Sequence, residues 1–353
     1  MPYDPIRFRP CRSFLPPYIL DALARAGDEA ARRAALETVI SSAAMRARRD
    51  TLAALPIMAA IPSVRQAKER LVYDMKQGTH PLPGRIILRE GEKQAVKDAA
   101  AKEAYKNLGL TYDFYRTVFS RNSLDDEGQA LIASVHYGKG YNNAFWNGEQ
   151  MVFGDGDGRI FTRFTRSLDV VGHELSHGVV THTCNLEYFG QSGALNEHFA
   201  DVFGVLTEQW SLGQAADKAA WLVGAEIIGP KAAIKAIRTF KAGKAFENDP
   251  LFGTDPQPKH MRDFYEGADD DGGVHINSGI PNHAFYRVAA ALGGKAWETA
   301  GPVWYKALSA LGRKSGFMDA ARTTGEIAAS LYGPKSREAA AVKAGWKGVG
   351  LGV

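Results

Sequence analysis

Hydrophobic and polar positions divide the chain into three parts with different periodicities. Between residues 18 and 55, apolar residues recur among charges at helical spacing, and the proline-containing stretch LPIMAAIPSV follows. Residues 70–164 contain short β-rich pieces, RIILRE, LIASVHYG and QMVFGDGDG, with one long helical pattern, DAAAKEAYKNLGLTYDFYRTVF. From residue 167 onward, helical patterns dominate and are separated by Gly and Pro. The pattern predicts a helical first segment, a strand-rich middle and a helical C-terminal part.

Composition indicates a globular protein. Hydrophobic residues make up 45% of the chain and charged residues 23%, which is typical of folded domains. The net charge of +4 is small for 353 residues, and no basic cluster stands out beyond the first fifty, so we expect no nucleic-acid partner. Cys11 and Cys184 are the two cysteines, too few for a disulfide framework.

The first twenty residues decide the expected compartment. The sequence MPYDPIRFRPCRSFLPPYIL contains prolines and arginines and lacks the uninterrupted apolar core of a secretory signal. No window of the chain approaches the roughly twenty apolar residues that a membrane span needs. We therefore expect a cytoplasmic monomer with no membrane partner. Secretion by a route that needs no signal peptide is the alternative.

The strongest chemical signal is the sequence from His173 to His177, HELSH, in an apolar-periodic stretch that predicts a helix. Histidines at i and i+4 project from one helical face, about 5–6 Å apart at Cβ. Both imidazoles can then reach one tetrahedral Zn²⁺ at about 2.0–2.1 Å. Glu174 is placed to act on a metal-bound water, as in metalloproteases. The alternative is two helix histidines beside a surface glutamate.

A third protein ligand is needed, because a catalytic zinc keeps its fourth position open. Glu197 follows His177 by twenty residues, which leaves room for a turn and the start of a second helix. Asp201 lies one turn later on the same face, where it can accept the second N–H of a ligating histidine. Taken alone, Glu197 is more typical of an exposed glutamate on a helix. Beside the two-histidine motif, a zinc ligand becomes the preferred interpretation.

A third cluster, DDGGVHINSG, begins at Asp270. Its Gly-Gly turn could bring His275 close to the metal, and Asp270 could hold that histidine protonated. An imidazolium there would stabilise the oxyanion that forms when a peptide carbonyl is attacked. The residues alone favour the alternative, a turn with a solvated acidic run and a capping histidine.

Five motifs together resemble the thermolysin family of zinc peptidases. YNNAFWNG, MVFGDGDG, HELSH, the NE…D segment and DGGVHINSG occur in the family's order over roughly residues 70–350, and LPPYIL resembles the short propeptides of the protealysin-like branch. The resemblance implies an α+β, two-lobed zincin fold. Residues 1–64 would be a propeptide, residues 65–183 a strand-rich catalytic lobe that includes the His-Glu-x-x-His helix, and residues 184–353 a helical catalytic lobe.

The resemblance also implies a zinc-dependent endopeptidase. Zinc would be held by His173, His177 and Glu197, with Asp201 behind them. The metal would lower the pKa of a bound water and polarise the scissile carbonyl. Glu174 would take a proton from that water and deliver it to the leaving amine.

Substrate contacts follow from the same resemblance. Tyr188 and His275 would donate to the oxyanion, while Asn143 and the carbonyl of Ala144 would bind the substrate main chain as an added strand. Arg238 would hold a substrate carbonyl after the scissile bond. Large apolar residues would line the pocket for the residue after that bond: Phe161, Phe164, Val170, Val223, Ile227 and Ile237. We therefore expect cleavage before bulky hydrophobic residues, although each of these side chains, taken singly, is more often plain core.

The sequence departs from the family at its paired calcium site. Asp169 and Glu208 stand at two matching positions, but Ala220, Leu222 and Ala225 occupy three others. Hard cations need many oxygen ligands. The substitutions disfavour a paired site and also a single calcium ion.

The first segment would act as an intramolecular inhibitor. The stretch from Phe14 to Leu20 would lie in or near the cleft, and self-catalysed cleavage would fall between about Ala59 and Arg70. Cys11 could ligate zinc in the precursor, but an unpaired cysteine near a chain end is the preferred interpretation.

Two other functions compete with an endopeptidase. A precursor that holds zinc but serves by interaction would not need Glu174 and His275, and both are present. An aminopeptidase needs an acidic cluster for the substrate amine, which the sequence lacks outside its DDD run. We therefore expect proteins or peptides, cleaved at internal bonds, to be the substrates.

Overall fold

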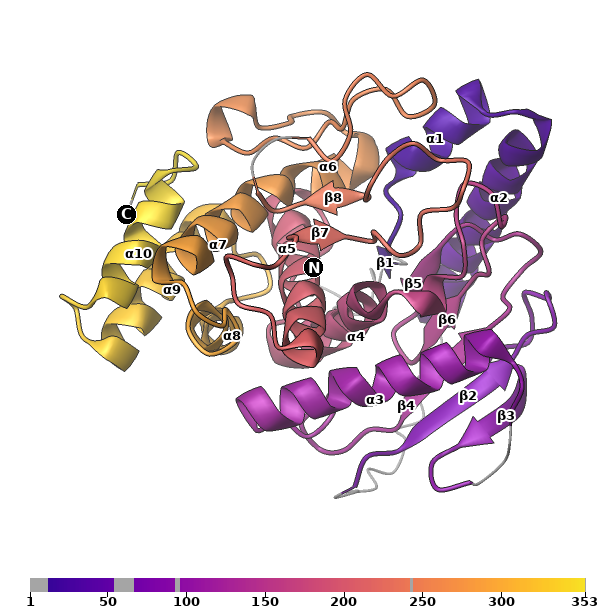
Figure 1. Ribbon diagram of the computed structural model, residues 1–353, viewed down its shortest axis with the longest axis horizontal. Coiled ribbons are helices and arrows are strands. Elements are labelled where there is room, and N and C mark those ends of the chain that lie inside the picture. The colour runs from indigo at the N-terminus through magenta and orange to yellow at the C-terminus, as the bar shows by residue number, and fades with distance from the viewer. Residues whose placement is uncertain (1–11, 54–66, 93–95, 242–243, 353) are drawn as a thin grey trace, which may run out of the picture.

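The N-terminal half of the protein is built on a mixed β-sheet, seen in a computed structural model that describes residues 12–53, 67–92, 96–241 and 244–352 (Figure 1). Its strands are β1 (Arg12–Ser13), β2 (Arg70–Asp74), β3 (Arg85–Arg89), β4 (Leu131–Val135), β5 (Ala144–Trp146) and β6 (Met151–Phe153). The six strands lie in the order β1-β5-β6-β4-β2-β3. Only β4 is parallel to its neighbours, β2 and β6, and the other pairs are antiparallel.

Helices make up most of the remainder. They are α1 (Pro17–Ala26), α2 (Glu29–Ala53), α3 (Ala99–Phe119), α4 (Leu168–Thr183), α5 (Gly190–Leu212), α6 (Asp269–Asn277), α7 (Gly279–Leu292), α8 (Ala300–Ala310), α9 (Phe317–Tyr332) and α10 (Arg337–Lys347). Two short strands, β7 (Leu222–Val223) and β8 (Arg238–Thr239), pair antiparallel beside α5 and α7. The mixed α+β content and the order of a strand-rich part before a helical part agree with the expectation from the sequence.

The helix α4 lies at the centre of the molecule, where α3, α5 and β5 all pack against it (Figure 1). Every residue from 168 to 180 is buried. Buried polar side chains are stable only when they are hydrogen-bonded or bind a metal. The histidines and glutamate of the HELSH motif must therefore find partners inside the protein.

The first segment forms two helices where the sequence pattern predicts one. Its break falls at Gly27, where a Cβ atom would lie 2.5 Å from the carbonyl oxygen of Leu23, closer than side chains tolerate. Asp28 then starts α2, because its carboxylate accepts the backbone N–H of Ala31 at 3.0 Å. The predicted linker at residues 55–64 and Cys11 lie outside the described residues, and the proposed boundary at residue 64 stays a prediction.

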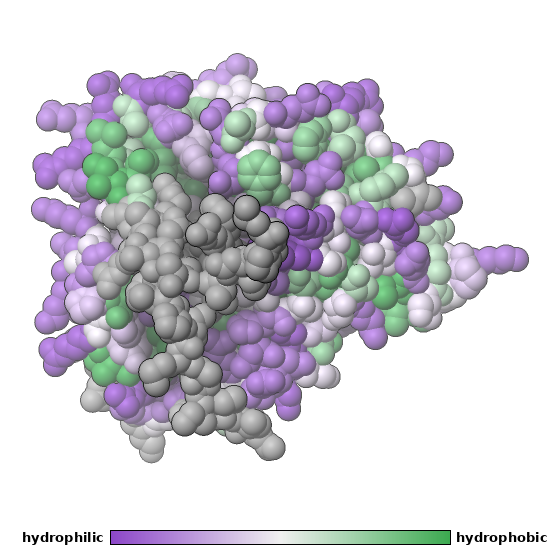
Figure 2. Space-filling view, turned by 180° about the vertical axis from the view of Figure 1, so that it is seen from behind, coloured by the Kyte–Doolittle hydropathy of each residue, from purple (hydrophilic) through white to green (hydrophobic). Residues whose placement is uncertain are grey.

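The surface carries scattered apolar side chains. Figure 2 shows the face opposite to that of Figure 1, where hydrophilic residues occupy much of the rim and hydrophobic residues gather at the upper left. On α2, Leu36 and Ile40 are 52% and 67% exposed. Among the described helices, none has the length and hydropathy to span a bilayer.

A histidine between two carboxylates makes the stability of the strand-rich half depend on pH. His136 follows β4, and its ring nitrogens lie 2.8 Å from Asp155 and 2.8 Å from Asp98. The hydrogen bond that His136 donates to Asp155 outweighs burial and raises the pKa of His136 to about 9. Because the unfolded value is about 6.5, the stabilisation is complete below that pH and is lost as the pH rises toward 9.

We expect His136→Gln to lower the melting temperature by several degrees near pH 6 and by much less above pH 9. Thermal unfolding of both proteins across this pH range measures the difference. A difference that stays constant with pH would show that His136 acts by packing alone.

Candidate active site

Close approach of α4 and α5 positions the metal-ligating residues. The two helices cross at Gly172 and Gly204. A Cβ atom at Gly204 would lie 2.5 Å from the carbonyl oxygen of Asp169 and 3.0 Å from the backbone nitrogen of His173. With only hydrogen at this position, α5 lies close enough to α4 to place Glu197 opposite the two histidines of the motif.

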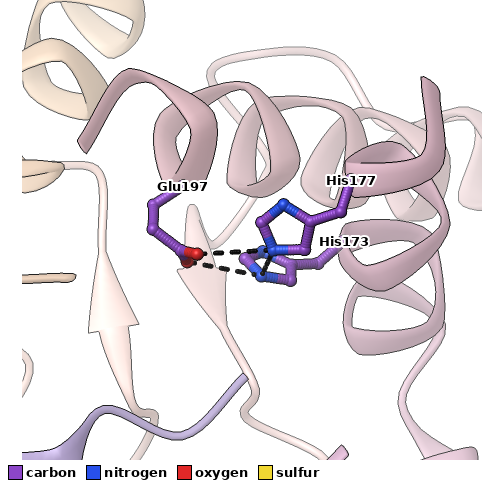
Figure 3. A group of neighbouring side chains, drawn as sticks. All are labelled: His173, His177 and Glu197. Carbon is purple, nitrogen blue, oxygen red and sulfur yellow. Dashed lines mark hydrogen bonds and ion pairs between the residues drawn. The ribbon is translucent and has the colours of Figure 1, made fainter. Parts of the chain in front are cut away.

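Three buried side chains converge on one point, as Figure 3 shows. The Nε2 atoms of His173 and His177 are 3.1 Å apart, and each lies 3.4–3.5 Å from an oxygen of Glu197. Ligands about 2.0–2.1 Å from a tetrahedral ion lie roughly 3.3–3.4 Å from one another, so the spacing of the three side chains is that of zinc ligands. One oxygen of Glu197 has no hydrogen-bond partner among the described residues. The residues present therefore fit Zn²⁺ and leave a fourth position for water or substrate.

Outer hydrogen bonds orient both imidazoles. The Nδ1 atom of His173 lies 2.8 Å from Asp201, and that of His177 lies 2.8 Å from the amide oxygen of Asn196. Since each Nδ1–H donates to its partner, each Nε2 keeps a lone pair for the metal. Asn196 was not among the predicted site residues, although its position just before Glu197 on the same helix is a signal that could have identified it.

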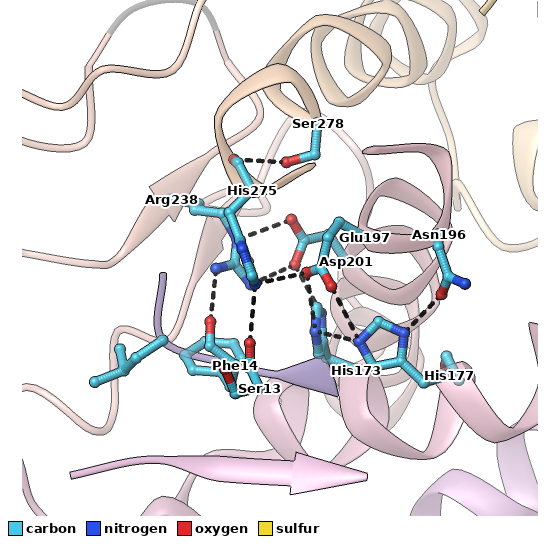
Figure 4. Close-up of polar contacts among 12 residues, drawn as sticks. Ser13, Phe14, His173, His177, Asn196, Glu197, Asp201, Arg238, His275 and Ser278 are labelled. Atoms are coloured by element: carbon cyan, nitrogen blue, oxygen red, sulfur yellow. Dashed lines mark hydrogen bonds and ion pairs between the residues drawn. The ribbon is translucent and has the colours of Figure 1, made fainter. Parts of the chain in front are cut away.

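Asp201 is the centre of a buried polar network (Figure 4). The guanidinium of Arg238 donates twice to its carboxylate, at 2.8 and 2.9 Å, and Asn282 donates at 2.9 Å. Burial opposes ionisation of Asp201, but Arg238 and His173 outweigh burial and hold its pKa well below the usual range. Asn282, a further residue that sequence reasoning missed, also binds His198 at 2.7 Å.

Glu174 is buried and its two carboxylate oxygens have no hydrogen-bond partner among the described residues. Burial and the charge of Glu197 raise the pKa of Glu174 well above the usual value. A carboxylate buried beside the metal-ligating histidines can act as a general base toward a metal-bound water.

A left-handed turn brings His275 to the site. Four consecutive residues, 270–273, have φ between 51° and 79°, which two glycines of the turn adopt without strain. The turn places Asp270 2.6 Å from His275 Nδ1. Burial lowers the pKa of His275, but the charges of Asp270 and Glu197 outweigh burial and raise it to about 9. The hydroxyl of Tyr188 donates to Glu197 and lies 3.3 Å from His275 Nε2.

The predicted substrate-binding residues surround the first segment of the chain. Ser13 and Phe14 lie between β5 and the metal-ligating residues, with Arg238 above them (Figure 4). Phe14 is fully buried, and its ring lies edge-on to His173 and to Phe164, at centroid distances of 5.3 and 6.4 Å. All six predicted pocket residues are buried in the same hydrophobic cluster as Phe14.

Protein donors surround Asp169, one of the two carboxylates at the family's calcium position. The carboxylate of Asp169 accepts hydrogen bonds from the backbone of Val170 and Gly224, at 2.8 and 2.6 Å, and from the hydroxyl of Ser167. Burial and the charge of Asp169 raise the pKa of Glu208 to about 8. The expectation that the pair holds no calcium stays a prediction.

A raised carboxyl pKa costs stability when the group ionises. Since the unfolded value is about 4.3, the stability of the protein falls as the pH rises from there toward the folded pKa of about 8 for Glu208. We expect Glu208→Gln to raise the melting temperature above pH 8, by roughly 2–4 °C for each kcal/mol regained. Thermal unfolding with and without calcium checks this prediction. A calcium-dependent rise in the parent protein that is absent from the variant would contradict it.

Comparisons with known proteins identify the family. Residues 63–181 match the thermolysin metallopeptidase catalytic domain, and residues 184–351 match the thermolysin metallopeptidase alpha-helical domain. An extracellular metalloprotease of Pectobacterium carotovorum subsp. carotovorum is 42% identical over 354 residues, which cover 99% of each chain. Protease PrtS of Photorhabdus sp. (strain Az29) is 52% identical over 289 residues, 80% of this chain and 76% of that protein.

A solved structure is also similar along nearly the whole chain. The precursor of protealysin, a metalloproteinase from Serratia proteamaculans, superimposes with a TM-score of 0.86 at 45% identity, covering 96% of this chain and 99% of that one. These matches confirm the predicted thermolysin-like, two-lobed α+β fold and the resemblance to the protealysin-like branch.

The prediction of a cytoplasmic protein is wrong. It rested on the lack of an apolar signal core, but the relative that matches along 99% of both chains is named an extracellular metalloprotease. The absence of one kind of export signal does not determine the compartment, because other routes do not depend on an apolar run.

The metal site and these matches lead to one conclusion. The ligand atoms of His173, His177 and Glu197 lie within 4.8 Å of one another, as a zinc site requires. The family to which both halves match is zinc-dependent and acts on protein or peptide substrates. The chain belongs to the thermolysin family of metallopeptidases, and it is a zinc-dependent metalloendopeptidase.

Proposed function

We propose that this endopeptidase cleaves before bulky hydrophobic residues and is made as a zymogen that processes itself. One observation carries the proposal: the side chain of Phe14, in the first segment, fills an apolar pocket beside the metal-ligating His173. A pocket that accommodates a phenylalanine in the precursor can accommodate the same kind of side chain from a substrate.

Each residue of the site has a proposed role. Bound zinc supplies a water of lowered pKa and polarises the scissile carbonyl. Glu174 accepts a proton from the water and transfers it to the leaving nitrogen. His275, held by Asp270, and Tyr188 donate hydrogen bonds to the carbonyl oxygen as negative charge develops on it. Asp201 is a positioning residue, because it orients His173.

Main-chain contacts would bind the substrate without regard to its side chains. In the proposed mode, Asn143 and the carbonyl of Ala144 extend the sheet by one strand, and Arg238 holds the carbonyl after the scissile bond. Specificity would then come from the pocket lined by Phe161, Phe164, Val170, Val223, Ile227 and Ile237. Full burial of a large apolar side chain contributes about 1.5–3 kcal/mol, which corresponds to roughly 10–150-fold in rate.

The first segment has the features of an inhibitory propeptide. Without it, β5 would form an edge of the sheet and the pocket beside His173 would be open. The side chains of Ile19, Leu20 and Leu23 on α1 are buried against the remainder of the protein. The whole-chain match to a precursor structure supports the same interpretation. We place the propeptide at residues 1–64, with cleavage between about Ala59 and Arg70.

One experiment tests both parts of the proposal. Peptides that differ only in the residue after the scissile bond are incubated with the processed enzyme, with and without a zinc chelator. We expect Phe and Leu to be cleaved roughly 10–150-fold faster than Gly, and the chelator to abolish all cleavage until zinc is restored. Equal rates for Phe and Gly would refute the proposed specificity, and activity that survives the chelator would refute the zinc-dependent mechanism.

A further inference from the structure

The first segment enters the cleft in a defined direction and register. The carbonyl oxygen of Ser13 accepts a hydrogen bond from His275 Nε2 at 2.9 Å, and that of Phe14 accepts one from Arg238 at 2.9 Å (Figure 4). The backbone N–H of Phe14 donates to the carbonyl of Ala144 at 3.0 Å. The carbonyl of Ser13 and the N–H and carbonyl of Phe14 are thus bound by His275, Ala144 and Arg238. All three of these residues are proposed to bind substrate.

The following residue continues the same register. The N–H of Leu15 donates to the side-chain oxygen of Asn143 at 2.8 Å, and the amide of Asn143 lies 3.5 Å from the carbonyl oxygen of Leu15. The guanidinium of Arg238 lies over the ring of Phe14, with 4.7 Å between its Cζ atom and the ring centroid. A Cβ atom at Gly224 would lie 2.8 Å from this ring, so the glycine makes room for it.

The register identifies one bond. In the proposed mechanism, His275 contacts the carbonyl that is attacked, and the pocket holds the side chain of the next residue. Here these are the carbonyl of Ser13 and the side chain of Phe14. The Ser13–Phe14 peptide bond therefore lies in the position of the scissile bond, with the ring of Phe14 edge-on to the metal-ligating His173 at a centroid distance of 5.3 Å.

Of the predicted junction, the structure describes residues 67–70, and these lie in another part of the sheet. Lys68 forms an ion pair with Asp113 of α3 at 2.8 Å, and the carbonyl of Glu69 accepts the N–H of Leu131 at 2.8 Å. In the sheet, β2 is separated from β5 by β6 and β4, a distance of roughly 14 Å at the usual strand spacing. While Phe14 fills the pocket, the cleft of the same molecule is closed to the junction.

Contacts of α2 also hold the propeptide against the catalytic part. Thr38 Oγ1 of α2 accepts the backbone N–H of Asn142 at 2.9 Å, and the hydroxyls of Ser42 and Tyr141 lie 2.8 Å apart. These contacts, with the buried side chains of α1, do not depend on residues 1–13. A cut before Phe14 would leave its side chain in the pocket.

We infer that the zinc-loaded chain hydrolyses its own Ser13–Phe14 bond within one molecule, and that a second molecule must cut the junction. The inference rests on the proposed function. One water is consumed: its oxygen adds to the carbonyl carbon of Ser13, which becomes a carboxylate, while the C–N bond breaks and the nitrogen of Phe14 takes up both water protons to become an N-terminal ammonium group. The product that starts at Phe14 is inhibited while Phe14 occupies the pocket, so the molecule that cuts the junction of another is one whose pocket Phe14 has left.

Mass spectrometry of the full chain after addition of zinc tests the order of the two cuts. We expect a species of residues 14–353 to form first, at a rate that does not change with protein concentration. Loss of the propeptide at the junction should follow, at a rate that rises with concentration, and only then should casein be hydrolysed. Junction cleavage with no prior species beginning at Phe14, or a Ser13–Phe14 cut whose rate rises with concentration, would overturn the inference.

Two variants distinguish the inference from the proposed function. Glu174→Gln should make neither cut alone, yet catalytic wild-type enzyme added to it should cut its junction and leave its Ser13–Phe14 bond largely intact. Phe14→Ala should slow the first cut roughly 10–150-fold, whereas the matched control Leu36→Ala, on the exposed face of α2, should not. If casein is hydrolysed but no species beginning at Phe14 ever forms, the inference fails and the proposed function stands. If processed wild-type enzyme cleaves nothing, the proposed function fails.

A readout without zinc tests the register itself. In metal-free Glu174→Gln protein, hydrogen exchange should be slow at the backbone amides of Phe14 and Leu15. Asn143→Ala should speed exchange at Leu15, whose N–H loses its acceptor, more than at residues of α2. Rapid exchange at both amides in the metal-free Glu174→Gln protein would show that these amides are not hydrogen-bonded to Ala144 and Asn143, and would contradict the inference.

Discussion

Replacement of Glu174 by Gln should lower kcat/KM for peptide hydrolysis by about 10³-fold, the effect typical of losing a general base. Glutamine has the shape of glutamate but cannot accept the proton of the attacking water. The zinc content should not change, because Glu174 is not among the three converging ligand residues. Kinetics on a peptide substrate, with metal analysis of the same sample, measure both quantities. For these measurements the propeptide is removed in trans by wild-type enzyme, which is then separated from the variant.

The matched control is Glu149→Gln, at an exposed glutamate just after β5, which should keep full activity. Glu174→Gln should also raise the stability of the metal-free protein near neutral pH. The parent must keep a carboxyl with a strongly raised pKa in a buried site, and that cost disappears with the charge. If the variant kept more than about a tenth of the parent's activity, a different group would have to be the base.

Replacement of Arg238 by Met should cost about 3–5 kcal/mol of folding free energy, because it leaves the buried carboxylate of Asp201 without its cation. Both side chains are inaccessible to solvent, and two hydrogen bonds join them. Chemical denaturation in the Glu174→Gln background, which prevents self-digestion, measures the cost. The expected fall in Tm is roughly 5–15 °C.

An exposed pair provides the control for Arg238. Arg159 forms an ion pair with Asp28, whose side chain is 56% exposed, and Arg159→Met should cost at most about 1 kcal/mol. Adding Asp201→Asn to Arg238→Met should recover part of the loss, because it removes the unpaired charge. A loss below about 1 kcal/mol for Arg238→Met alone would show that Asp201 is neutralised in another way.

Local sequence features predicted much of the site. The i and i+4 spacing placed His173 and His177 on one helical face, and the helix α4 indeed brings their Nε2 atoms together. The family resemblance also placed the Phe14 stretch in or near the cleft. The split between α1 and α2 was missed, because a single glycine in a long helical pattern is usually tolerated. Asn196 and Asn282 were missed because asparagine has no distinctive pattern, and its partners lie far along the chain.

The sequence by itself predicted the two-histidine metal motif from the spacing of His173 and His177, and its resemblance to the thermolysin family predicted the α+β fold class and the three zinc ligands. Only the tertiary structure decided which distant groups meet. Asp201 and Arg238 pair across 37 positions, and Ser13 reaches His275 across 262. Such contacts depend on how α5, β5 and β8 pack together. No local sequence pattern specifies the positions of these elements relative to one another. The contacts of Ser13 with His275 and of Phe14 with Arg238 are therefore set by the folded chain.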